Sequence, residues 1–399
     1  MNPRLNLLQP YPFEKLRQLF SDARPNPAYT HINLGIGEPR HAAPALIKNA
    51  ICKHLDGLAS YPATIGLESI REAIANWLEG RYAIPRPDPD TQIIPTLGSR
   101  EALFSLAQAI LDPSERAVVV CPNPFYQIYE GAALLGGAEP YFVNADPERN
   151  FNCDYDSVPE TVWKKTRLLY LCSPANPTGA VLTLPQWEKL FALSDRHGFI
   201  IASDECYSEI YFGDNAPLGG LQAAHYLGRK GYPRLVMLSS LSKRSNVPGM
   251  RSGFVAGDAD ILKKFLLYRT YHGSAMSLTV QHASIAAWKD ESHVIENRAK
   301  YQAKFEAITP LLQEILDVAM PDAGFYLWAD VYKKTGLTDT AFAKKLYADC
   351  NVTVLPGCYL AREAHGINPG SNRIRIALVA EQDECMDAAR RMMDFTSRL

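Results

Sequence analysis

The sequence predicts an α/β protein with two domains, a large one built on a mostly parallel sheet and a smaller α+β one. The chain has 399 residues, which is long enough for two hydrophobic cores. Through its middle, short apolar runs alternate with longer helical patterns, as is typical of a parallel sheet covered by helices on both faces. This alternation stops near residue 285. We therefore expect a large domain at residues 41–285 and a small domain formed by residues 1–40 and 286–399.

Seven apolar runs are predicted to be the strands of the large sheet. They are five or six residues long, are mostly rich in Val, Ile, Leu or Phe, and cover residues 92–96, 116–121, 139–143, 167–172, 199–203, 235–239 and 252–256. Helical patterns between them cover residues 99–111, 126–135 and 185–197, and the last two end at glycines.

The remaining residues predict the small domain. Residues 281–316 have the pattern of a long helix broken at Pro310. Strands are predicted at residues 324–329, 352–355 and 374–378, together with a helix at 339–349 and a terminal helix. The N-terminal segment is expected to complete this domain.

Composition and charge argue against several classes of protein. The formal net charge of -2 gives no indication of a nucleic-acid or anionic-membrane partner. No apolar signal-peptide core is visible at the N-terminus, and no apolar run reaches the roughly 20 residues of a spanning helix, so we expect a cytoplasmic protein. The eight cysteines are scattered, without a Cys-x-x-Cys pair or zinc-like spacing, so we expect neither disulfides nor a metal site.

The most informative motif follows the sixth predicted strand. It reads Ser240-Leu241-Ser242-Lys243, and Arg251 lies on the turn that comes next. A lysine can hold an aldehyde cofactor covalently, while hydroxyls and an arginine can hold its phosphate. Taken alone, the segment is explained equally well by a surface loop, because serine and lysine are common in loops. The surrounding residues decide between these interpretations.

Other polar residues stand at the ends of predicted strands, where open α/β sheets bind ligands. Asp204 ends the fifth strand and either caps a turn or keeps a pyridine nitrogen protonated, and Tyr207 follows it. Asn176 lies in a turn-forming Asn-Pro-Thr-Gly segment after the fourth strand, and its amide also suits the phenolic oxygen of such a ring.

The first two strands are also followed by candidate ligands. Gly98-Ser99-Arg100 leads from the first strand into a helix, and is either an ordinary helix start or a set of free N–H groups for a phosphate. Tyr126, after the second strand, could stack on the face of a ring.

Together and in this order, these residues resemble the class I and II aminotransferases, which are pyridoxal phosphate enzymes of fold type I. The resemblance spans nearly the whole chain and includes Arg375 in the last predicted strand. It implies the fold of a fold type I transferase, the cofactor pyridoxal 5'-phosphate, and amino acid and 2-oxo acid substrates. It also implies a homodimer in which Tyr61 reaches the phosphate of the neighbouring subunit.

The resemblance assigns a role to each residue. Lys243 would hold the cofactor through an aldimine and move a proton between the substrate Cα and C4'. The cofactor would be bound by Asp204 at the pyridinium, Asn176 and Tyr207 at the phenolic oxygen, Tyr126 on the ring face, and the Ser99 and Arg100 amides, Ser240, Ser242 and Arg251 at the phosphate. The substrate α-carboxylate would be held by two parallel bonds from Arg375, with Arg373 as the competing candidate, and by Gly37 and Asn176.

The substrate is suggested by two longer stretches. Residues 8–17 and 242–251 resemble the succinyldiaminopimelate aminotransferases of bacterial lysine synthesis, which move an amino group from glutamate to N-succinyl-2-amino-6-oxopimelate. Arg40 and Lys15 are candidates for its distal carboxylates, although most surface cations are simply solvated.

Other interpretations stay open. The same residues serve aminotransferases for aspartate, alanine or aromatic amino acids, and carbon–sulfur lyases with the same cofactor. A non-catalytic regulator is disfavoured by the intact Lys243 and Asp204. A nicotinamide dehydrogenase is disfavoured because no strand leads into a Gly-x-Gly-x-x-Gly turn.

Overall fold

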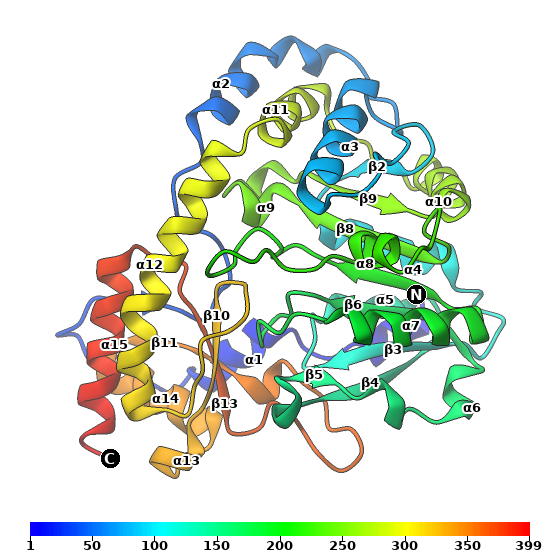
Figure 1. Cartoon of the computed structure of the whole chain (residues 1–399). Helices are drawn as coiled ribbons and strands as arrows, with labels where there is room; N and C mark the ends of the chain where they lie inside the picture. The colour runs from blue at the N-terminus through cyan, green and yellow to red at the C-terminus, as the bar shows by residue number, and fades with distance from the viewer.

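A computed structural model describes all 399 residues and shows a large sheet on one side and a smaller sheet on the other (Figure 1). The large sheet has eight strands in the order β2-β9-β8-β7-β6-β3-β4-β5. Their bounds are β2 (Ile93–Thr96), β3 (Val118–Asn123), β4 (Glu139–Asp146), β5 (Asn152–Cys153), β6 (Thr166–Cys172), β7 (Ile200–Asp204), β8 (Leu235–Ser240) and β9 (Gly253–Gly257). All seven predicted strands are present. The additional strand, β5, has only two residues and no sequence pattern of its own.

The direction of the strands confirms a mostly parallel sheet. Strands β4, β3, β6, β7 and β8 run parallel, while β9 is antiparallel to both β8 and β2, and β5 is antiparallel to β4. Parallel strands place their carboxyl ends at one edge, so the residues that follow β6, β7 and β8 come together there.

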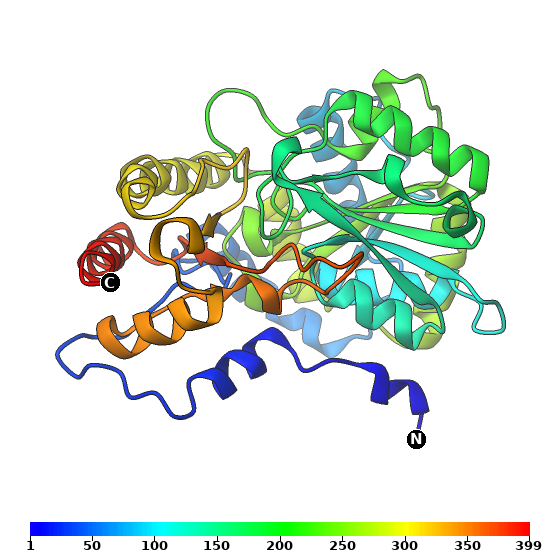
Figure 2. The same cartoon turned by 90° about the horizontal axis from the view of Figure 1, so that it is seen from below.

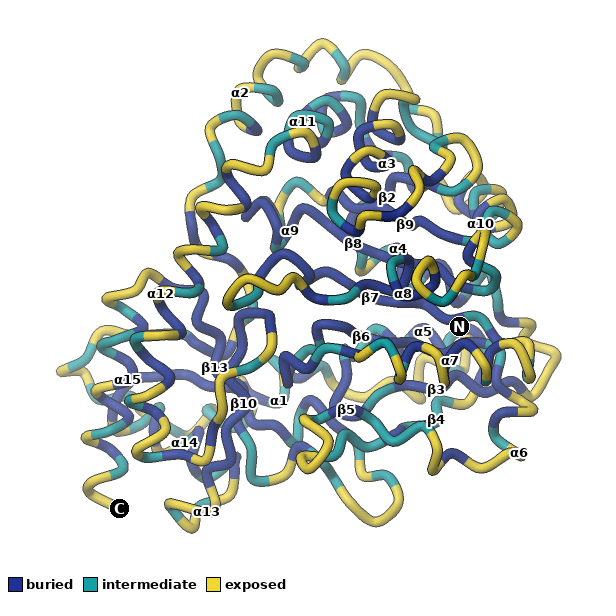
Figure 3. The backbone as a smooth tube through the Cα atoms, in the orientation of Figure 1, coloured by how far each residue is buried: buried dark blue, intermediate teal, exposed yellow.

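Helices cover both faces of this sheet, and most of its strand residues are buried (Figure 3). Alternate strand residues such as Val118 and Val119 belong to different cores. One core contains residues of α3 (Glu68–Tyr82), α7 (Leu184–His197), α8 (Gly220–Tyr226) and α11 (Leu278–Trp288), and the other contains residues of α4 (Ser99–Ile110), α5 (Ile128–Leu135) and α10 (Ala259–His272). We call this assembly the large part.

The second assembly, the small part, has its own core. Its antiparallel sheet has the order β10-β13-β12, with β10 (Tyr326–Asp330), β12 (Leu355–Pro356) and β13 (Arg373–Ala377), and it packs with α12 (Ser292–Ile315), α14 (Asp339–Cys350) and α15 (Gln382–Thr396). The N-terminal segment joins it because β1 (Ile32–Asn33) pairs in parallel with β11 (Val352–Thr353). The same segment, with α1 (Pro12–Leu19), runs along the outside of the molecule (Figure 2). The domain boundaries at residues 40 and 285 stay a prediction.

The predicted helix at residues 281–316 is wrong in one respect. The chain does break there, but between α11 and α12, and Pro310 lies inside α12. The side chain of Asp290, just before α12, accepts a bond of 3.1 Å from the backbone N–H of His293 in the first turn of that helix. A proline removes one helical hydrogen bond but does not have to end a helix that is packed on both parts. No helix in the structure is both long and apolar enough to cross a membrane.

Candidate active site

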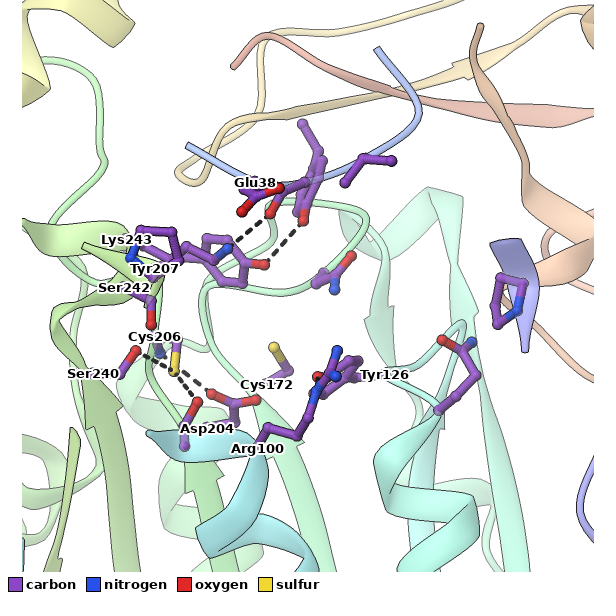
Figure 4. Close-up of a pocket in the computed structure, with 18 of the residues that line it drawn as sticks. Glu38, Arg100, Tyr126, Cys172, Asp204, Cys206, Tyr207, Ser240, Ser242 and Lys243 are labelled. Atoms are coloured by element: carbon purple, nitrogen blue, oxygen red, sulfur yellow. Dashed lines mark hydrogen bonds between the residues drawn. The ribbon is translucent and has the colours of Figure 1, made fainter. Parts of the chain in front are cut away.

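A cavity of about 530 Å³ lies at the carboxyl ends of β6, β7 and β8 and is closed on the other side by the small part (Figure 4). Twelve of the predicted site residues line it: Gly37, Ser99, Arg100, Tyr126, Asn176, Asp204, Tyr207, Ser240, Ser242, Lys243, Arg251 and Arg375. Their segments are far apart in sequence: the residues that follow β6, β7 and β8 meet at one edge of the parallel sheet, while Gly37 and Arg375 come from the small part.

Lys243 lies on the short helix α9 (Leu241–Arg244), directly after β8. Its Nζ donates a hydrogen bond of 2.7 Å to the carbonyl oxygen of Gly37 and lies 5.3 Å from the centre of the Phe325 ring. Burial, together with the positive charge of Arg375, lowers the pKa of Lys243 to about 8. A substantial fraction of the amine is therefore neutral near physiological pH, as a nucleophile toward an aldehyde requires.

Asp204 is buried at the floor of the cavity, at the end of β7. Its Oδ2 accepts a bond of 2.8 Å from the hydroxyl of Tyr129, and its Oδ1 accepts one of 3.4 Å from the backbone N–H of Cys206. Burial raises the pKa of Asp204, and these hydrogen bonds oppose that rise. The site thus contains a carboxylate held by neutral donors, and a cation placed against it would keep it ionised.

The opposite wall offers donors for an anion. Ser99 opens α4, whose first N–H groups have no partner within the helix, and it lines the cavity together with Ser240, Ser242 and Arg251. Gly98 precedes them at φ 79°, and a Cβ there would lie 2.6 Å from Nη2 of Arg251. The guanidinium therefore lies directly over the turn only because this residue is glycine.

Arg375 lies on β13 and reaches the cavity from the small part. Its Nη1 donates to Oδ1 of Asn176 at 3.0 Å and its Nη2 donates to the carbonyl oxygen of Gly35 at 2.8 Å. Arg373, two residues earlier, lies 3.8 Å from Asp330 and does not line the cavity. The geometry therefore places Arg375, and not its competitor, beside the other site residues.

Several lining residues were missed by sequence reasoning. Tyr326 bonds the hydroxyl of Tyr207 at 3.0 Å, and its own hydroxyl would lie 1.9 Å from a Cβ at Gly37. Cys172 and Cys206 both line the cavity, and the Cys206 thiol donates to the Ser99 hydroxyl at 2.9 Å. No sequence signal marked these positions, because their roles depend on neighbours from distant segments.

Three other candidates lie outside the cavity. Tyr61 is fully exposed, and so contributes nothing to the site of its own chain. Arg40 is paired with Glu384 at 2.6 Å. Lys15 lies 5.9 Å from the ring of Tyr359 and is not among the lining residues. The side chain of Arg100 does line the cavity, where it bonds the hydroxyl of Tyr126 at 2.5 Å.

Comparison with known proteins identifies the family. The model for "Aminotransferase class I and II" matches residues 29–392. The chain belongs to the class I and II aminotransferases. An aminotransferase from Neisseria meningitidis of known structure is 53% identical, with a TM-score of 0.96 over 99% of this chain and 100% of that one.

Two further relatives of this aminotransferase carry substrate names. The LL-diaminopimelate aminotransferase of Aquifex aeolicus is 32% identical over 98% of this chain and 97% of its own length. The structure of a probable N-succinyldiaminopimelate aminotransferase from Thermus thermophilus is 26% identical, with a TM-score of 0.85 over 96% of this chain and 99% of that one.

Aminotransferases of this family depend on pyridoxal phosphate, and the cavity fits that cofactor. The cavity has three kinds of polar group in different places. They are a buried carboxylate (Asp204) on the floor, an amine of lowered pKa (Lys243), and hydroxyls with a guanidinium (Ser99, Ser240, Ser242 and Arg251). The glycine at position 98 lets the Arg251 guanidinium lie against the start of α4, beside its free N–H groups. Such an arrangement suits a ring with a basic nitrogen, an aldehyde and a phosphate.

Proposed function

We propose that this aminotransferase moves an amino group between glutamate and N-succinyl-2-amino-6-oxopimelate, forming N-succinyl-LL-2,6-diaminopimelate and 2-oxoglutarate in bacterial lysine synthesis. One observation carries the proposal: both stretches that resemble succinyldiaminopimelate aminotransferases contribute to the same cavity. Tyr11, Pro12 and Phe13 of the first stretch and Ser242, Lys243 and Arg251 of the second all line it. The diaminopimelate names of the two relatives support the same carbon skeleton.

In this proposal, separate groups of cavity residues bind the cofactor's phosphate, the cofactor's ring and the substrate. Ser99, Ser240, Ser242 and Arg251 bind the cofactor's phosphate, while Asp204, Asn176, Tyr207 and Tyr126 orient its ring. When bound, the cofactor supplies an electron sink for the bond broken at the substrate Cα. Arg375 holds the α-carboxylate by two parallel bonds, and the amine of Lys243 moves the proton between Cα and C4'.

A second candidate substrate is free LL-diaminopimelate, because the relative from Aquifex aeolicus is named for it. The two molecules differ at the end remote from the reacting carbon. Free diaminopimelate carries a distal ammonium there, whereas the succinyl form replaces it with an amide and adds a carboxylate. Residues that contact the remote end of the substrate, and not Lys243 or Arg375, must therefore distinguish the succinyl form from free diaminopimelate.

Substrate competition tests the proposal. The purified enzyme is given N-succinyl-LL-diaminopimelate, LL-diaminopimelate, acetylornithine, aspartate, alanine or an aromatic amino acid with 2-oxoglutarate, and glutamate formation is followed. We expect the succinyl compound to have a kcat/KM at least about 10-fold above the others, a difference of about 1.4 kcal/mol. A 10-fold preference for any other donor would overturn it. Release of pyruvate and ammonia from a sulfur-containing amino acid would instead indicate a lyase.

The lysine assignment has its own control. We expect the Lys243→Ala variant to fold, to lose the visible absorbance of the bound cofactor and to lose nearly all transamination. Normal turnover by this variant would exclude Lys243 as the catalytic residue.

We also propose a homodimer in which Tyr61 completes the neighbouring site. The side chains of Leu55, Leu58 and Tyr61 are 50%, 71% and 103% exposed, which leaves an apolar stretch without partners in the single chain. Mixing Lys243→Ala with Tyr61→Ala chains provides a sharp test. In a mixed dimer one site has both wild-type residues, so about a quarter of the sites should regain activity if subunits exchange at random. No recovery after verified exchange would argue against a shared site. The cytoplasmic location stays a prediction.

A further inference from the structure

A buried polar cluster lies next to the segment of Lys243, where the chain crosses between the large part and the small part. His41 lies on the segment that leads from β1 in the small part to α2 (Ala45–Lys53) in the large part. Asn297 and Lys304 lie on α12, which crosses in the other direction, from beside α9 to α15 (Figure 1). All three side chains are buried. We call them the crossing cluster.

Hydrogen bonds define which atoms of this cluster donate and which accept, starting at Lys304. Nζ of Lys304 lies 2.8 Å from the carbonyl oxygen of Ala380 and 2.9 Å from Nε2 of His41. Burial lowers the pKa of Lys304 to about 8, so below that pH the group is mainly an ammonium, which has only donors. In that form Nε2 is the acceptor and the ring is neutral, with its proton on Nδ1. That Nδ1 lies 3.0 Å from Oδ1 of Asn297 and donates to it. Burial, which lowers the pKa of His41, favours the same neutral ring.

Asn297 connects the cluster to the lysine segment, residues 243–244, through the two ends of its side-chain amide. Its Oδ1 also accepts a bond of 2.7 Å from Nδ2 of Asn246. Its Nδ2 then faces the backbone carbonyl oxygens of Lys243 at 3.3 Å and Arg244 at 3.4 Å. The amide cannot be reversed without placing Oδ1 against two carbonyl oxygens, so its orientation is determined at both ends.

A second set of contacts joins the cluster to the amine itself. The ring of Tyr301 lies 4.8 Å from His41 and 4.4 Å from Nζ of Lys304, and it stacks on Phe325 at 5.6 Å. Nζ of Lys243 lies over the other end of this row, 5.3 Å from Phe325.

The same crossing segment also holds the amine directly. Gly37, which accepts the hydrogen bond from Nζ of Lys243, lies four residues before His41. The backbone and the side chain of Lys243 are therefore both anchored to the two crossings.

We infer that Asn297 is a positioning residue for Lys243, and that His41 and Lys304 hold Asn297 so that the placement of the small part against the large part determines where the lysine amine lies. The cluster touches neither the cavity nor a ligand. It acts on the reaction only through the backbone of residues 243–244 and the aromatic row.

The inference is tested with Asn297→Ala, His41→Leu and His41→Gln. Glutamine keeps one donor and one acceptor, so it can replace the ring between Lys304 and Asn297, whereas leucine can replace neither bond. Asn152→Ala serves as the control, since Asn152 is also buried but bonds only the carbonyl oxygen of Arg149, away from Lys243. Each variant is prepared without cofactor, its thermal unfolding is recorded, and pyridoxal phosphate is then added.

Two measurements distinguish a loss of lysine positioning from a general loss of protein stability. The first is the rate at which the bound cofactor's visible absorbance grows after addition, which needs no amino acid and is independent of the true substrate. The second is the division of the effect between kcat and KM for the amino donor. We expect Asn297→Ala and His41→Leu to slow capture and lower kcat by about 10-fold, with KM changed by less than about threefold. His41→Gln should stay within about threefold of the wild type.

Two results would overturn the inference. One is capture and kcat within about threefold of the wild type in Asn297→Ala. The other is an equal slowing in Asn152→Ala at the same loss of unfolding temperature. If Asn297→Ala does not fold, His41→Leu against His41→Gln decides the question, because equal capture rates in those two variants would contradict it.

Discussion

Asn176 and Arg375, 199 positions apart in the chain, are joined by a hydrogen bond of 3.0 Å from Nη1 of the arginine to Oδ1 of the asparagine. This bond uses the amide oxygen, so the amide nitrogen is left as the donor facing the cavity. The residue proposed for the cofactor's phenolic oxygen is thereby oriented by the residue proposed for the substrate carboxylate. Cofactor and substrate binding are expected to be coupled through this pair.

Replacing Arg375 with lysine should weaken substrate recognition. Lysine keeps the charge but cannot form two parallel bonds to a carboxylate while also bonding Asn176 and Gly35. Loss of one charged hydrogen bond predicts a fall in kcat/KM of about 10- to 100-fold, measured by steady-state kinetics. Arg373→Lys is the matched control on the same strand. A larger effect at Arg373 than at Arg375 would reverse the assignment.

Replacing Gly98 with alanine should weaken cofactor binding. A Cβ there would meet Nη2 of Arg251 at 2.6 Å, and φ 79° is unfavourable for any L side chain. We expect the dissociation constant of pyridoxal phosphate to rise by about 10-fold or more, measured by titrating the cofactor-free protein. Gly80→Ala provides the control, since nothing lies within 4 Å of its Cβ. Unchanged affinity in Gly98→Ala would place the phosphate elsewhere.

Replacing Tyr129 with phenylalanine should move the acid limb of the kcat profile to higher pH. The lost hydroxyl bond of 2.8 Å lowers the pKa of Asp204, so its removal lets that pKa rise. A protonated Asp204 no longer supports a protonated pyridine nitrogen. We expect kcat to fall by about three- to tenfold at the acid end of the profile and less at its centre. The control is Tyr170→Phe, whose hydroxyl bonds the carbonyl oxygen of Leu103. An identical shift in both variants would contradict a specific role.

Glu205 predicts a pH dependence of stability. Burial raises its pKa from 4.5 to about 7, although it accepts bonds from Gly220, Ser203 and Tyr82. Between these two pH values the folded protein binds a proton that the unfolded chain has released, so the free energy of unfolding falls as pH rises. This stabilisation is complete below pH 4.5 and is lost as pH passes about 7.

The Glu205→Gln variant lacks this titration. We expect its free energy of unfolding, relative to the wild type, to increase by roughly 2–3 kcal/mol from pH 4.5 to 7.5, as measured by urea denaturation. Glu115→Gln, at an exposed position, should show no such trend. Parallel pH curves for wild type and Glu205→Gln would show that the carboxyl is not perturbed.

Much of the large sheet could be predicted from local pattern. Most of its strands are buried on both faces and appear in the sequence as short, mainly apolar runs, whereas β4 is only partly buried. Strand β5 was missed because two residues carry no period, and the helix break was placed at Pro310 because propensity was weighed without packing. The bond from the backbone N–H of His293 to Asp290, at the start of α12, was not anticipated from the sequence.

Some residues of the candidate site could likewise be predicted from local sequence, and others could not. Asp204 ends a strand, and Lys243 and Asn176 lie within four residues after one. Their chemistry and location can therefore be predicted from neighbouring residues. Tyr129 and Tyr326 act through hydroxyls that meet partners from other elements. No local pattern distinguishes such a tyrosine from a core aromatic.

The sequence by itself determined the fold class, the order of the strands along the chain and the residues at their ends, because these depend on contacts and periods within a few residues. Only the tertiary structure decided between Arg373 and Arg375. Both point to one face of β13, but two residues of strand separate them by about 7 Å, and the surrounding parts place only Arg375 at the cavity. It alone also revealed the bond from His41 to Asn297 and the bond from Asn297 to the lysine segment, since hydrogen bonds between distant segments exist only after folding brings their donors and acceptors together.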